Sequence, residues 1–140
     1  MMKILEMMKD MDLNIPSNIN ILHNMESKFE IKFPKQYFDF MKIHNGGEGP
    51  IGEYGYLAVW DTEEIFDYNS TSSMKNFLPE LFYFASDRGG TIYAFDMRNA
   101  SMNIVELPDD SIDYSEVQVI ANSFEEFITY IYEIDDSEYI

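Results

Sequence analysis

Carboxylates are the most abundant side chains in this sequence that could take part in a chemical reaction. The sequence has 140 residues, of which 26 are acidic and 9 are basic. Asp87 and Asp96 flank a predicted strand, and a pair of carboxylates can carry out acid–base catalysis. Ser86 lies in "FASDRGG", which lacks the G-x-S-x-G pattern of a nucleophilic serine. His23 and His44 have no second histidine three or four residues away, as a metal-binding helix would provide. We therefore predict a protein that is not an enzyme and has no catalytic, metal-binding or cofactor-binding residues.

Glycines are the second group that could bind a ligand. The stretch "FPKQYFDFMKIHNGGEG", residues 33–49, places glycines after a predicted helix. A phosphate-binding loop needs them before a helix N-terminus, because the backbone N–H groups and the positive end of the helix dipole must face the anion. Glu48 also adds a negative charge at this point. We therefore interpret the glycine clusters as structural turns, formed by Asn45, Gly46 and Gly47 and by Gly89 and Gly90.

Charge is distributed unevenly along the chain, whose formal net charge is −17. Residues 1–42 contain six acidic and six basic residues, whereas residues 99–140 contain eleven acidic residues and no lysine or arginine. Such a surface repels nucleic acids and anionic membranes, and it attracts a basic protein partner. An acidic composition that serves only solubility is the alternative interpretation.

Three acidic clusters are candidates for the partner-binding surface. Acids at a helix N-terminus are explained by capping, but acids at the C-terminus of the last predicted helix oppose the helix dipole and need another explanation. A solvated loop and tail is the alternative for the other two clusters. The candidates are Asp61 and Glu64, with Glu63 and Asp67 beside them; Asp109, Asp110, Asp113 and Glu116; and Glu133, Asp135, Asp136 and Glu138.

Trp60 is the only tryptophan and a further candidate, because tryptophan is enriched at binding hot spots. Its place at the end of the β-prone run 56–60 is also typical of a core residue, and we favour the core interpretation.

The first part of the sequence predicts three helices. Ile4, Met7, Met8 and Met11 have helical spacing within residues 2–11. Ser17 is a plausible N-cap for a second helix, and Pro34 is suited to the first position of a third. The second helix carries Leu22, Met25 and Phe29, and the third places Tyr37, Phe38 and Met41 toward the core.

The second part predicts strands at 56–60, 81–85, 91–96, 102–106 and 117–121. The pairs Asp61/Glu64 and Ser123/Glu126 have capping-box spacing and each opens a helix. We therefore expect an α+β fold with an antiparallel sheet of about four to six strands, flanked by N-terminal helices and a C-terminal helix. Residues 1–140 form one predicted domain. The charged N-terminus does not resemble a signal peptide, and we expect a cytoplasmic protein.

The order of four motifs resembles the SMI1/KNR4 family of the SUKH superfamily over residues 17–132. "FPKQYFDFMKIHNGGEG" is similar to its helix that starts at "LP" and ends at an "NGG"-type turn. "YLAVWDTEEIFDYN", "FYFASDRGGTIYAFD" and "ANSFEEFITYI" follow in the family's order of strand and helix, hairpin, and closing helix. Phe33 stands where the family has leucine, and Arg88 stands where it often has a glycine or small residue.

This resemblance implies a non-catalytic protein of the bacterial immunity type, which binds and neutralises a cognate toxin domain, frequently a nuclease. Fungal relatives imply an alternative, an intracellular regulatory or scaffold module that binds a cellular protein. A small-molecule or nucleotide-binding domain that uses the glycine turns is a third and weaker possibility.

Overall fold

The fold was analysed in a computed structural model that describes residues 1–135. Asp136 and Glu138, two of the candidate binding residues, lie outside the described residues. The helices are α1 (Met2–Met7), α2 (Ile19–Phe29), α3 (Lys35–Ile43), α4 (Thr62–Thr71), α5 (Ser73–Phe77) and α6 (Phe124–Tyr132), with a 3₁₀ turn at Tyr114–Glu116.

The described strands form one antiparallel sheet in which spatial order follows chain order from β1 to β7. They are β1 (Asp12–Leu13), β2 (Gly47–Ile51), β3 (Gly55–Val59), β4 (Leu81–Ser86), β5 (Thr91–Asp96), β6 (Ile104–Pro108) and β7 (Gln118–Ala121). The α+β class and the antiparallel sheet are confirmed. The sheet has seven strands, so the expected number of four to six was wrong.

The two strands that the sequence did not predict are β1 and β2. β2 has the sequence "GEGPI", in which glycine and proline lower the β propensity. It becomes a strand because five residue pairs, from Gly47↔Val59 to Ile51↔Gly55, join it to β3. Gly47, predicted to lie in a turn, is therefore the first residue of a strand. Gly46 lies in the turn itself, with φ +72°.

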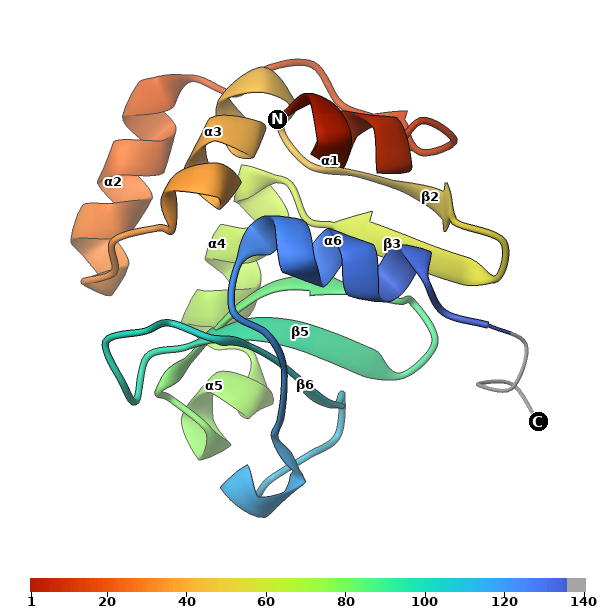
Figure 1. Ribbon diagram of the computed structural model, residues 1–140. Coiled ribbons are helices and arrows are strands. Elements are labelled where there is room, and N and C mark those ends of the chain that lie inside the picture. Colours follow the sequence, from red (N-terminus) through yellow and green to blue (C-terminus); the bar gives the residue numbers. More distant parts are fainter. Residues whose placement is uncertain (136–140) are drawn as a thin grey trace.

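Helices cover both faces of the central strand β4, all six residues of which are buried. Figure 1 shows α6 across the front of the sheet, with α1 beside it. The ring of Phe84 contacts Tyr37 of α3 and Phe127 of α6. On the opposite face, the Tyr83 hydroxyl donates to the carbonyl of Leu78, after α5, at 2.9 Å. The core is therefore aromatic and lies on both sides of β4.

The side chain of Asn69 in α4 takes the place of a neighbouring strand for part of β4. Its Nδ2 donates to the Tyr83 carbonyl at 2.8 Å, and its Oδ1 accepts from the Tyr83 N–H at 2.9 Å. β3 pairs with β4 only at Ala58↔Ser86 and Val59↔Ala85. Asn69 thus satisfies backbone groups of β4 that β3 does not reach.

Helix starts follow the predicted capping residues in two of three cases. Asp61 accepts a hydrogen bond from the Glu64 N–H, and Ser123 accepts one from the Glu126 N–H. In α2 the cap is Asn18, whose Oδ1 accepts from the Asn20 N–H at 2.8 Å, and not Ser17. In α3, Tyr37 and Met41 are buried as expected and Phe38 packs partly buried against the core, while Phe40, which was not predicted, is fully buried.

None of the helices within residues 1–135 has the length and apolar character that crossing a membrane requires.

Candidate functional site

The turn between β4 and β5, residues 87–90, organises the charged end of the sheet. The carboxylate of Asp87 accepts hydrogen bonds from the backbone N–H groups of Gly89 at 2.8 Å and Thr91 at 3.0 Å. Arg88 has a left-handed backbone, with φ +58°, and Gly90 has φ +110°. An arginine seldom adopts this conformation, which favours glycine. The turn fixes the Arg88 side chain between two other elements.

Arg88 binds one acid from α4 and another from β2. Its Nη1 and Nη2 donate to the two carboxylate oxygens of Glu64 at 2.9 and 3.2 Å, and Nη2 also donates to Glu48 at 3.1 Å. Glu48 accepts a further hydrogen bond from the Tyr56 hydroxyl at 2.8 Å. Tyr56 first, and then Arg88, hold the pKa of Glu48 below its ordinary value.

The motifs of the sequence meet beside this ion pair. Asp61 caps α4 through the Glu64 N–H at 2.8 Å, which places Glu64 at the start of the helix. Asn45 Oδ1 accepts from the Thr62 N–H at 3.0 Å, so the glycine turn after α3 is joined to the same helix start. A Cβ at Gly46 would lie 2.4 Å from the Val59 carbonyl oxygen. The glycine therefore allows two backbone segments to pack closely, a role that the turn interpretation did not include.

Three hollows surround the β4–β5 turn. The first, of about 450 Å³, is lined on the α4 side by Glu48, Glu64 and Arg88. The second, of about 380 Å³, lies on the α6 side, where the Tyr130 hydroxyl donates to Glu106 at 2.9 Å. The third, of about 460 Å³, lies between the turn and β7.

The linings of these hollows define a surface that we call the acidic turn surface. Within the described part of the chain, Arg88 is the one basic side chain among the residues that line it. Its charged residues are Asp12, Glu48, Asp61, Glu64, Asp87, Arg88, Glu106, Glu116 and Glu133.

The structure brings several predicted acids to this surface. Asp61 and Glu64 line the first hollow, Glu133 the second and Glu116 the third. Asp109 lies next to the turn, because its N–H donates to the Gly90 carbonyl at 2.8 Å. Three clusters that are separate in the sequence therefore reach one end of the sheet.

Other predicted residues lie outside the hollows. Asp110 and Asp113 are exposed in the loop after β6, where Asp113 accepts from the Ser115 N–H at 2.8 Å. Asp135 is exposed after α6. Trp60 is buried, with 3% of its surface exposed, and its ring packs against Tyr68. We leave Trp60 out of the candidate surface because its side chain belongs to the core.

The sequence did not indicate Asp12, Glu48, Tyr56 or Glu106 as site residues. Glu106 carries a signal that could have found it, because it is an acid within the predicted strand 102–106 and next to buried Val105. Glu48 and Arg88 are 40 residues apart, and their pairing depends on the fold. Among residues 1–135, His, Asp and Glu side chains form no group of three or more that could hold a metal ion.

Comparison with known proteins gives one family match. A family model, the SMI1 / KNR4 family (SUKH-1), matches residues 17–130. The search of curated proteins found no match. The matched range extends from the residue before the α2 cap into α6 and includes the β4–β5 turn. The chain therefore belongs to the SMI1 / KNR4 (SUKH-1) family, which includes immunity proteins.

Proposed function

We propose that this protein is a bacterial immunity protein that binds a basic toxin domain through the acidic turn surface and so neutralises it. The observation that carries the proposal is the convergence of eight carboxylates and one guanidinium around the β4–β5 turn. Membership of a family of protein-binding immunity modules supports it. The proposed action is occlusion of the partner's surface, without catalysis by this chain.

Electrostatics supports the choice of a basic partner. The net charge of −17 attracts cations over the Debye length, about 8 Å at physiological salt. Complementary charges raise association rates by factors of 10 to about 1,000 over neutral surfaces, and the effect falls as salt rises. A nuclease toxin fits this requirement because it must present cations to its phosphate-rich substrate.

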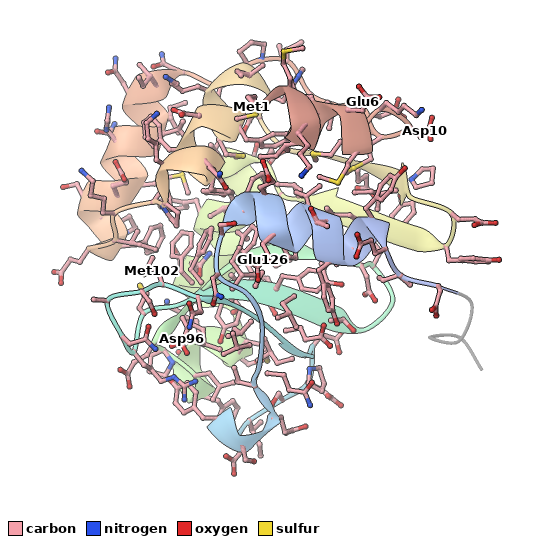
Figure 2. The ribbon with its side chains drawn as sticks, viewed as in Figure 1. Met1, Glu6, Asp10, Asp96, Met102 and Glu126 are labelled. Carbon is pink, nitrogen blue, oxygen red and sulfur yellow. The ribbon has the colours of Figure 1, made fainter. Side chains whose placement is uncertain are left out.

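A growth assay tests the function. The full chain is co-expressed in turn with each basic nuclease toxin domain that its source genome encodes, and cell survival is measured. We expect protection by the wild type and a weaker effect for the double variant Glu116→Gln, Glu133→Gln, which removes two charges from the acidic turn surface. The double variant Glu6→Gln, Glu126→Gln is the matched control. It removes two exposed charges on α1 and α6 that do not line the hollows, at positions labelled in Figure 2.

Two results would count against the proposal. Failure of the wild-type chain to protect cells would oppose the immunity function and favour the alternative, a regulatory or scaffold module for a cellular protein. Equal losses of protection in the two double variants would oppose the acidic turn surface as the binding site.

A further inference from the structure

The sheet has two edges of different character. One edge is β1, which has two residues and pairs Asp12 with Glu48 of β2. Short strands and charged side chains are common ways to protect an edge from further pairing. The other edge is β7, with the sequence "QVIA", which has no charge and no proline. β7 is therefore the open edge of the described sheet.

The two faces of β7 differ in the groups that flank them. Gln118 is opposite Glu106, whose carboxylate accepts a hydrogen bond from the Tyr130 hydroxyl of α6. Gln118 therefore lies on the face of the sheet that α6 covers, and this face carries acidic side chains. The third hollow places Glu116 beside Gln118 on the same surface. Val119 is opposite Val105 and points to the other face, because successive residues of a strand alternate. Its side chain is 57% exposed.

We propose that an extended segment of a basic partner protein adds an eighth strand to the sheet by pairing with β7. Backbone hydrogen bonds would supply the pairing, and the side chains would supply the selectivity. The segment should alternate lysine or arginine, facing Glu106 and Glu116, with apolar residues that pack beside Val119. This inference rests on the proposed function, because it specifies how the basic partner docks.

Charge argues for a partner protein rather than a second copy of this chain. Two copies that pair through β7 would bring Glu106 and Glu116 of each copy together, and each copy has a net charge of −17. Like charges that face each other across paired strands are destabilising. A basic segment would instead place lysine or arginine near Glu106 and Glu116, so that the interaction is attractive.

The test uses the ¹⁵N-labelled full chain and an acetylated, amidated decapeptide that alternates lysine and valine. We expect slower hydrogen exchange for amides of residues 118–121 when the peptide is added. Val119→Lys should weaken peptide binding at least 10-fold, because it places a cation against the cationic peptide. Ile21→Lys, which adds the same charge at a 45% exposed site on α2, should change binding less than 2-fold.

Fold integrity is checked by the amide spectrum of each variant without peptide. Val119→Thr keeps a β-branched, uncharged side chain at the edge and should keep peptide binding within about 3-fold, whatever Val119→Lys does to folding.

Three results would overturn the inference. Shifts over the acidic turn surface without protection of β7 would exclude strand pairing while leaving the proposed function intact. Protection of β7 that rises with protein concentration in the absence of peptide would assign the edge to a second copy. No response at millimolar peptide would also exclude it. Failure of the proposed function is seen separately, as loss of wild-type protection in the growth assay.

Discussion

The guanidinium of Arg88 is hydrogen bonded to both carboxylate oxygens of Glu64, at 2.9 and 3.2 Å, across 24 residues of sequence. These contacts join the β4–β5 turn to the start of α4, and the contact with Glu48 extends the link to β2. The pKa of Arg88 is raised, first by its hydrogen bonds to Glu64. The one basic residue of the acidic turn surface is therefore fixed in place by acids of two other elements.

Two replacements of Arg88 distinguish the contribution of its ion pairs to stability from the cost of its left-handed backbone. An exposed ion pair contributes about 0.2–1 kcal/mol, and a left-handed backbone costs a non-glycine residue about 1–2 kcal/mol. Arg88→Ala loses the pair and keeps the strain, so we expect the free energy of unfolding to fall by about 0.5–1 kcal/mol. Arg88→Gly relieves the strain and should be the more stable variant. Urea unfolding measures both, and an alanine variant more stable than the glycine variant would contradict this account.

The glycines of the two turns should respond differently to alanine. Gly46 has φ +72°, and a Cβ there would lie 2.4 Å from the Val59 carbonyl oxygen. Because the obstacle is backbone, we expect Gly46→Ala to lower the free energy of unfolding by at least about 2 kcal/mol. A Cβ at Gly89 would meet only Asp87, at 3.6 Å, so Gly89→Ala should cost less than about 0.5 kcal/mol. Thermal unfolding of the two variants tests this, and equal losses would refute it.

Local patterns in the sequence correctly predicted those features that depend only on residues close together in the chain. Asp61 and Ser123 were recognised as caps because their hydrogen bonds reach only three residues ahead. β2 was missed because pairing with β3, and not the propensity of "GEGPI", makes it a strand. In α3, Phe40 was missed as a core residue because its burial depends on packing against Phe124 of α6, which is distant in the sequence.

The candidate site was predictable in its charge but not in its geometry. The acidic character of residues 99–140 is visible in the composition, and Glu116 and Glu133 were candidates on that basis. Their common surface with Asp61 and Glu64 arises because the start of α4, the 3₁₀ turn and the end of α6 lie around the β4–β5 turn. No local pattern encodes this arrangement, because the register of the central strands sets it.

Asn69 should be among the residues most important for stability. It is 3% exposed and satisfies both backbone groups of Tyr83, as well as the carbonyl of Ile65 at 2.8 Å. Asn69→Ala leaves buried polar groups without partners, each of which costs about 1–3 kcal/mol, so we expect a loss of at least about 2 kcal/mol. Exposed Asn76→Ala is the control, with an expected change below about 0.5 kcal/mol in the same urea titration. Comparable losses for the two variants would refute this role for Asn69.

Because of Lys75, the free energy of unfolding should change with pH in the alkaline range. Burial lowers its pKa to about 8, while its ammonium group donates to the Leu81 carbonyl at 2.8 Å. The unfolded chain, with a lysine pKa near 10.4, binds more protons between pH 8 and 10 than the folded chain does. The free energy of unfolding should therefore rise with pH in this window, by about 1–2 kcal/mol. Urea unfolding at pH 7.5 and 9.5 measures the rise, which Lys75→Met should abolish. A fall in wild-type stability over this window would contradict the assignment.

Stopped-flow association kinetics test most directly whether the acidic turn surface is the docking site for a basic toxin domain. The full chain is mixed with the toxin domain that it neutralises in the growth assay, over a series of salt concentrations. We predict that Glu116→Gln with Glu133→Gln slows association about 3- to 10-fold at low salt, and that the difference disappears at high salt. Glu6→Gln with Glu126→Gln, which has the same net charge, should slow it less than 2-fold. Equal association rates for the two double variants at every salt concentration would contradict the account.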